Sequence, residues 1–254
     1  MITPTLLAID FDGVLCDGLI EYFQTAWRVY VQIWQPADRT PPESVAEQFY
    51  RLRPVVETGW EMPLVIRSLL QGVPESEILL HWSEIAAAQL AADSLSAAEL
   101  GAAVDRVRDQ WIQADLENWL AQHRFYPGVI DRLREICARS VRPVIITTKE
   151  GRFVQQLLQQ QEISLNSDQI WGKEVKQPKT VSLRQIRTAN DAIWFVEDRL
   201  KTLQSVLAQP DLADVRLFLA DWGYNTPADR QSASEHDKIE LLSIKAFCQD
   251  FSQW

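Results

Sequence analysis

The sequence has few cysteines, no excess of positive charge and no long apolar run. Cys16, Cys137 and Cys248 lie far apart and in no CxxC or histidine-rich spacing, so neither a disulfide framework nor a zinc site is predicted. The 35 acidic against 25 basic residues give a formal net charge of -10, which disfavours nucleic acids and anionic membranes as partners. No segment approaches ~18 consecutive apolar residues, and the first ten residues do not resemble a signal peptide. We therefore expect a cytoplasmic protein that binds neither nucleic acid nor membranes.

Short apolar runs that end in polar residues predict buried strands. These runs are residues 6–9, 144–146, 193–196 and 215–219. Segments with helical character accompany the later runs, at about residues 129–139, 153–161, 180–188 and 200–208. Such alternation is typical of a Rossmann-like α/β core, a mainly parallel sheet with helices on both faces. Ligands bind these sheets beyond the carboxyl ends of the strands, so the polar residues that end the runs are the first candidates for a site.

The stretch from about Gly18 to Phe125 contains no convincing strand pattern and is rich in Ala, Leu, Glu, Gln and Trp. It predicts an all-helical cap inserted after the first strand. The Ser/Thr-x-x-Glu pattern of the capping box predicts helix starts at Thr40 with Glu43, Ser44 with Glu47, and Ser96 with Glu99. The predicted domains are therefore a core of residues 1–17 and 126–254 and a helical cap of residues 18–125.

The first apolar run ends in Asp10-Phe11-Asp12-Gly13, where the glycine can supply a backbone conformation that other residues resist. This segment resembles the first signature of the haloacid dehalogenase superfamily, in the phosphatase branch with a helical cap after that signature. The three other signatures have counterparts in the same order. They are Thr147 after Ile145-Ile146, Lys179 in Pro178-Lys179-Thr180, and Asp198 in Phe195-Val196-Glu197-Asp198.

The resemblance implies a Mg²⁺-dependent phosphohydrolase that acts on a small phosphorylated metabolite. Asp10 would be the nucleophile and form an aspartyl-phosphate, which divides one difficult displacement into two. Asp12 would be the general acid for the leaving oxygen and then the general base for water. Thr147 would donate a hydrogen bond to a phosphoryl oxygen, and Lys179 would offset negative charge. Mg²⁺ would take carboxylate oxygens of Asp10 and Asp198 and the backbone carbonyl of Asp12.

Several residue assignments stay open on the sequence alone. Thr147 aligns better with the second signature than Thr148, whereas Lys173 and Lys176 compete with Lys179 for the third. The last acid of the fourth signature could instead cap the helix that follows it.

The fourth signature also departs from the usual family pattern. The family usually has Gly before the last Asp and another acid shortly after it, where this chain has Glu197 and Thr202. Glu197 could replace the missing acid and support the metal, or the affinity for the metal could be reduced.

Two other functions compete with hydrolysis. A phosphomutase of the same superfamily would keep the same acids but return the phosphoryl group to a bound sugar. A non-catalytic binding or assembly protein that retains the fold is the contrasting class, motivated by the altered fourth signature and the Trp-rich cap. In the cap, Arg51, Arg53 and Arg67 are candidates for substrate contacts. Neither the substrate nor the oligomeric state follows from the sequence.

Overall fold

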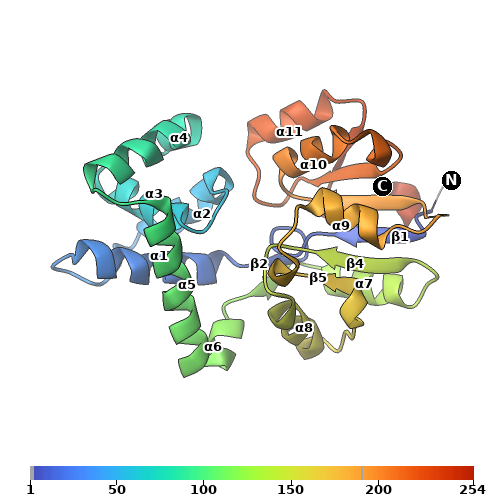
Figure 1. Cartoon of the computed structure of the whole chain (residues 1–254), viewed down its shortest axis with the longest axis horizontal. Helices are drawn as coiled ribbons and strands as arrows, with labels where there is room; N and C mark the ends of the chain where they lie inside the picture. Colours follow the sequence, from blue (N-terminus) through green and yellow to red (C-terminus); the bar gives the residue numbers. More distant parts are fainter. Residues whose placement is uncertain (1–2, 190) are drawn as a thin grey trace. The chain divides into compact units, whose positions relative to one another are not determined.

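The protein consists of two compact units in a computed structural model that describes residues 3–189 and 191–254 (Figure 1). The first unit comprises Met1–Asp17 and Arg124–Trp254, and the second comprises Gly18–His123. Arg124 and Phe125, which the sequence assigned to the cap, form strand β3 (Arg124–Phe125) and lie in the first unit. They do so because their backbone pairs with the short strand that follows the first loop.

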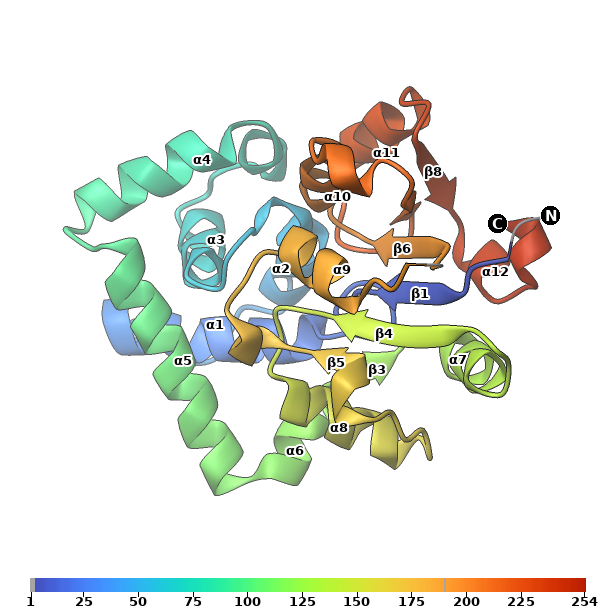
Figure 2. The same cartoon turned by 45° about the vertical axis from the view of Figure 1, so that its right-hand side comes forward.

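A six-stranded sheet forms the centre of the first unit, in the order β5-β4-β1-β6-β7-β8, and every neighbouring pair is parallel. Figure 2 shows β6, β1, β4 and β5 one beside another. The strands are β1 (Leu6–Ile9), β4 (Arg142–Ile146), β5 (Ile170–Trp171), β6 (Ile193–Glu197), β7 (Arg216–Ala220) and β8 (Ile239–Leu242). The prediction contained β1, β4, β6 and β7 but neither edge strand. Because β4, β1 and β6 are adjacent, the residues that follow them meet at one edge of the sheet.

Side chains of the sheet alternate between two apolar cores. Leu6 and Ala8 of β1 belong to one buried cluster, together with side chains of α9 (Lys179–Ile186), α10 (Leu200–Leu207) and α11 (Pro227–Ser234). On the opposite face, Trp194 packs against Phe251 and Trp254, with ring centroids 5.5 and 5.8 Å apart. The remaining helices of this unit are α7 (Val129–Cys137), α8 (Gly151–Gln160) and α12 (Ile244–Phe247). The predicted Rossmann-like α/β core is confirmed.

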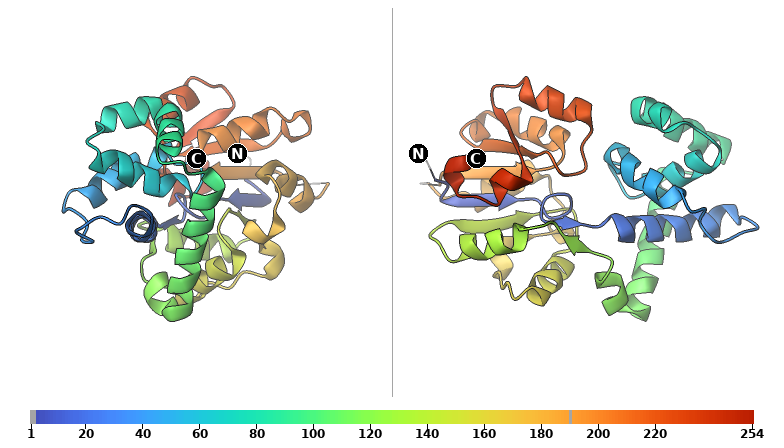
Figure 3. Two further views of the ribbon diagram at one scale, coloured as in Figure 1. Left: turned by 60° about the vertical axis from the view of Figure 1, so that its left-hand side comes forward. Right: turned by 180° about the vertical axis from the view of Figure 1, so that it is seen from behind.

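The second unit contains helices and no strand, in agreement with the predicted all-helical composition; it is drawn in blue to green in Figure 3. Its helices are α1 (Leu19–Trp34), α2 (Val45–Leu52), α3 (Glu61–Leu70), α4 (Glu75–Ala92), α5 (Ala97–Ala114) and α6 (Leu116–Leu120). Trp27, Tyr30 and Trp34 stack along α1 with ring centroids 5.3 and 5.2 Å apart, so these aromatic residues pack the unit. Across the described residues, every helix is too short or too polar to cross a bilayer.

The three predicted capping boxes have different outcomes. Ser96 and Glu99 form the complete box at the start of α5. Ser44 precedes α2, but its side chain makes no capping hydrogen bond. The prediction at Thr40 was wrong, because the chain bends there and no helix starts. Pro42 disfavours the helical conformation at the residue before it, which explains the difference.

A pair of short strands carries the chain between the two units. β2 (Cys16–Asp17) pairs with β3 in antiparallel fashion, with Cys16 opposite Phe125 and Asp17 opposite Arg124. Both strands belong to the first unit, so the chain leaves this unit and returns to it through two strands that pair with each other.

Candidate active site

Asp10 lies in the loop that directly follows the central strand β1 and is only 7% exposed. Its backbone N–H donates to the carbonyl of Val196 at 2.9 Å, and its Oδ1 accepts a hydrogen bond from the N–H of Phe11 at 2.8 Å. Gly13 has a φ of +87°, as expected of the turn glycine, and a Cβ there would overlap the carboxylate of Asp198. The turn after β1 therefore needs glycine both for its conformation and for its close approach to Asp198.

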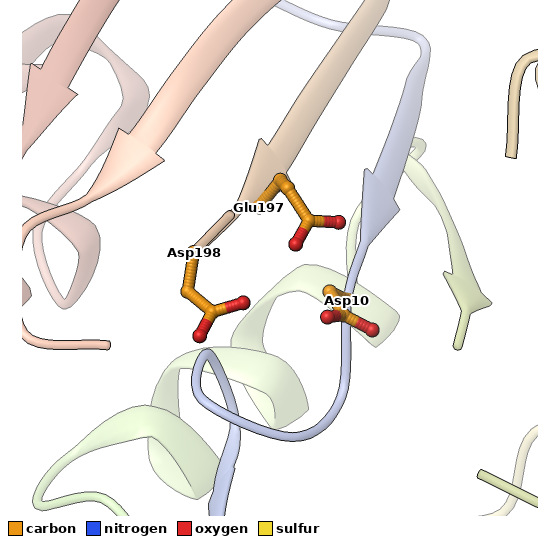
Figure 4. A group of neighbouring side chains, drawn as sticks. All are labelled: Asp10, Glu197 and Asp198. Carbon is orange, nitrogen blue, oxygen red and sulfur yellow. The ribbon is translucent and has the colours of Figure 1, made fainter. Parts of the chain in front are cut away.

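Three buried carboxylates, Asp10, Glu197 and Asp198, gather between the ends of β1 and β6 (Figure 4). One oxygen of each lies within 4.8 Å of the others. Burial and then the neighbouring carboxylates raise the pKa values of Asp10 and Glu197 to about 7 and also raise the pKa of Asp198. Burial is the larger cause of these shifts, and repulsion between the neighbouring carboxylates adds to it. Mg²⁺ prefers such oxygen ligands, so the residues present fit the ion that the resemblance implies.

Lys179 brings positive charge to this cluster from the first turn of α9. Its Nζ lies 2.8 Å from Oδ1 of Asp10 and 2.7 Å from Oε2 of Glu197. Burial alone would lower the pKa of Lys179, but the two carboxylates raise it above its ordinary value, so the ammonium stays charged. Lys173 and Lys176 are exposed. Of the three lysines that competed in the sequence, Lys179 is the one beside Asp10.

Glu197 holds this lysine from the end of β6. It is fully buried, and its Oε1 accepts a hydrogen bond from the N–H of Arg199 at 3.0 Å while its Oε2 contacts Lys179. Both oxygens therefore have partners within the protein. The geometry favours a role in orienting Lys179, although Glu197 also belongs to the carboxylate cluster.

Asp198 is fixed by the loop that follows the neighbouring strand β7. Its Oδ2 accepts a hydrogen bond from the N–H of Tyr224 at 2.7 Å. The side-chain amide of Asn225 donates to the carbonyls of Asp198 and Ala220 at 3.0 and 2.8 Å. Arg199, not Asp198, occupies the N-cap position of α10, so helix capping does not account for Asp198. Sequence reasoning missed Tyr224 and Asn225, and their position after a predicted strand is the only signal that pointed to them.

Thr147 and Asp12 complete the group of predicted site residues. Thr147 follows β4 and is buried, whereas Thr148 is exposed. Its Oγ1 accepts a hydrogen bond from the N–H of Lys149 at 3.2 Å, which leaves the hydroxyl hydrogen to be donated elsewhere. The Nζ of Lys149 lies 3.2 Å from Oδ2 of Asp12. The site thus contains a second lysine, to which the sequence analysis gave no role.

The three arginines suggested as substrate contacts in the cap make contacts within the helical unit. Arg51 pairs with Glu75 at 2.7 Å, Arg67 pairs with Asp93 at 3.3 Å, and the guanidinium of Arg53 lies 4.9 Å from the ring centre of Tyr22. These contacts favour structural roles for all three.

Comparison with solved structures identifies the fold. A haloacid dehalogenase-like family hydrolase from Streptococcus pneumoniae is 18% identical, with a TM-score of 0.58 over 94% of this chain and 95% of that one. A predicted phosphatase from Clostridium acetobutylicum is 14% identical, with a TM-score of 0.59 over 100% of both chains. A predicted phosphoglycolate phosphatase from Haemophilus somnus is 17% identical, with a TM-score of 0.55 over 94% of this chain and 95% of that one.

Comparisons of the sequence are less informative than the comparison of structures. No family model matches it, and no protein of curated function matches it. At the identities above, the structural likeness establishes the fold. The chain has the fold of the haloacid dehalogenase-like hydrolases.

Proposed function

We propose that this chain is a Mg²⁺-dependent phosphohydrolase that cleaves a small phosphate monoester through an aspartyl-phosphate at Asp10. The observation that carries the proposal is the buried Asp10 at the end of the central strand, with Lys179 on one oxygen and Asp198 beside it. The fold supports it, since the similar structures are described as hydrolases and phosphatases.

Contacts to Oδ1 orient Asp10 for attack. Oδ1 accepts from the N–H of Phe11 and contacts Lys179. A carboxylate oxygen of Asp10 attacks phosphorus, a new P–O bond forms, and the P–O bond to the leaving group breaks. The ammonium of Lys179 and the hydroxyl of Thr147 stabilise the negative charge on the phosphoryl oxygens.

Asp12 moves the protons in both halves of the reaction. Its carboxyl group donates a proton to the leaving oxygen as the ester bond breaks. The resulting carboxylate then accepts a proton from the water that attacks the aspartyl-phosphate, which releases phosphate and restores Asp10. The two transfers balance, so Asp12 ends the cycle as it began.

The proposed metal site consists of carboxylate oxygens of Asp10 and Asp198 and the backbone carbonyl of Asp12. Mg²⁺ bound there supplies the positive charge that allows an anionic ester to approach an anionic nucleophile. Glu197 supplies the additional acid of the fourth signature and orients Lys179. A small phosphorylated metabolite as substrate and a cytoplasmic location remain predictions.

A panel of phosphate esters assayed with and without Mg²⁺ tests this function. The Asp10→Asn variant should lose activity by about 10⁴-fold or more, because no carboxylate is left to attack phosphorus. Asp131→Asn is a matched control, since the Asp131 side chain is 81% exposed on α7. Undiminished turnover by a folded Asp10→Asn variant would rule out the nucleophile. Transfer of phosphate to a bound sugar would indicate a phosphomutase, and no turnover of any ester would favour a non-catalytic binding protein.

A further inference from the structure

We propose that Lys149 is a positioning residue for Asp12, which it holds so that one carboxyl oxygen is left to face the substrate. The inference rests on the proposed function, in which Asp12 transfers protons. The Nζ of Lys149 lies 3.2 Å from Oδ2 of Asp12, and the two side chains are only 8% and 14% exposed. A buried ammonium is costly unless it is paired, so this ion pair is a strong constraint on both side chains.

Both the backbone N–H and the backbone carbonyl of Lys149 make hydrogen bonds. Its N–H donates to Oγ1 of Thr147 at 3.2 Å, and its carbonyl accepts from the N–H of Lys173 at 2.9 Å. The segment that carries Lys173 is itself anchored, since Glu174 accepts a hydrogen bond at 3.0 Å from the N–H of Gly151, the first residue of α8. The lysine side chain therefore extends toward Asp12 from a fixed base.

The two carboxyl oxygens of Asp12 have different surroundings. Oδ2 contacts Lys149, whereas Oδ1 is buried and has no hydrogen-bond partner among residues 3–189 and 191–254. Buried polar atoms without a partner are rare in native proteins, and one within a group of proposed site residues points to a bound molecule. Oδ1 is therefore the oxygen that is left for contact with a bound molecule.

Lys149 and Lys179 have separate roles in this arrangement. Lys179 contacts Asp10 and Glu197, whereas Lys149 contacts Asp12. Loss of Lys149 should therefore impair proton donation to the leaving group and leave the contacts that orient Asp10 intact. The proposal predicts a defect that depends on the leaving group.

The test compares Lys149→Met with the wild type in the first phosphoryl transfer, followed as rapid release of the alcohol with Mg²⁺ present. The probes are p-nitrophenyl phosphate, phenyl phosphate and an alkyl phosphate. A p-nitrophenolate leaves without protonation, whereas an alkoxide needs it. We expect a loss of about 10–100-fold with the alkyl ester, less than about threefold with the p-nitrophenyl ester, and little change in KM. Lys176→Met is the matched control, because it removes the same charge from an exposed position.

A double-mutant cycle separates action through Asp12 from a general structural role. Because Lys149 acts through the Asp12 carboxyl group, Lys149→Met should cost little further activity in an Asp12→Asn background. Equal losses with all three esters, a raised KM without leaving-group dependence, or additive losses in the double variant would each overturn the proposal.

Crystal structures of the metal-free wild type, Lys149→Met and Lys149→Arg give a readout that needs no activity. The Asp12 carboxyl group should leave its orientation in Lys149→Met and keep it in Lys149→Arg. An unchanged orientation in Lys149→Met would overturn the positioning role. If the wild type hydrolysed none of the esters while the carboxyl group still moved, the proposed function would fail and the positioning role would stand.

Discussion

Buried carboxylates differ between the two units in the number and kind of their partners. In the helical unit, Glu21 is fully buried and accepts two hydrogen bonds from Arg108 at 2.8 and 3.0 Å, one from Thr25 at 2.7 Å and one from Trp119 at 3.2 Å. In the core unit, Asp10 and Glu197 share the single ammonium of Lys179, with Asp198 close by. A buried acid paired with its own guanidinium stabilises structure, whereas several buried carboxylates around one ammonium favour a ligand cation.

Glu61 is a second buried carboxylate of the helical unit that accepts several hydrogen bonds. Its carboxylate accepts from the backbone N–H groups of Glu57 and Thr58 at 2.7 and 2.6 Å and from the indole of Trp82 at 3.0 Å. The sequence alone does not separate such a residue from a catalytic acid, because both are buried carboxylates. The number and kind of hydrogen-bond donors separate them.

One of the two largest expected effects on stability distinguishes two glycines with positive φ, Gly13 in the core and Gly72 in the helical unit. Their φ values are +87° and +79°, but a Cβ at Gly13 would overlap Asp198, whereas nothing lies within 4 Å of a Cβ at Gly72. Gly72→Ala should cost about 1–2 kcal/mol from backbone strain. Gly13→Ala should cost about 2–5 kcal/mol, because overpacking adds to the strain. Urea unfolding measures both, and equal losses would show that the close approach to Asp198 does not matter.

Removal of the partner of Glu21 should have an effect of similar size. Arg108→Met leaves a fully buried carboxylate without its guanidinium, which should lower the free energy of unfolding by about 3–5 kcal/mol. The double variant Glu21→Gln/Arg108→Met, measured in the same unfolding experiment, should recover part of this loss because no charge is left unpaired. A single variant as stable as the wild type would contradict a structural role for the pair.

Replacement of Glu197 should affect turnover more than folding. Glu197→Gln weakens the contact that orients Lys179, so kcat should fall by about 10–100-fold with the fold intact. Glu61→Gln is the matched buried control, and it should lower the melting temperature while leaving kcat of the folded protein unchanged. If the two variants exchanged these phenotypes, the distinction between the two units would fail.

The smallest expected effect concerns helix starts in the helical unit. Ser96→Ala removes the side-chain bond of the capping box and should cost about 1 kcal/mol. Ser44→Ala removes no such bond and should change stability by less than about 0.5 kcal/mol. Thermal unfolding of both variants decides whether the observed hydrogen bond, and not the sequence pattern, predicts the loss.

The core strands could be predicted because β1, β4, β6 and β7 are nearly continuous apolar runs. The edge strands carry a weaker signal. β5 has two half-buried residues, and β8 buries only Ile239 and Leu242 of its four. Pairing with an already formed sheet stabilises both, and that partner is not visible in the local sequence.

The candidate site, like the sheet, could be predicted only in part from the local sequence. Asp10, Thr147 and Asp198 follow predicted strands, so strand order alone brings them toward one edge. The sequence predicted the start of α9 to within one residue, but it did not show which of three nearby lysines reaches Asp10. Asn225 contacts the backbone carbonyls of Asp198 and Ala220, and apart from its place after a predicted strand no residue pattern indicated these contacts. Lys149 could have been suspected, since it follows the second signature directly.

The paired strands β2 and β3 give the helical unit the topology of an enlarged hairpin turn. Asp17 and Arg124 face each other across an antiparallel pair, so a tight two-residue turn could replace everything between them without rethreading the chain. Insertions, deletions or exchanges of that turn leave the register of the six-stranded sheet untouched. The sequence between Asp17 and Arg124 can therefore change without moving the strands that carry the candidate site residues.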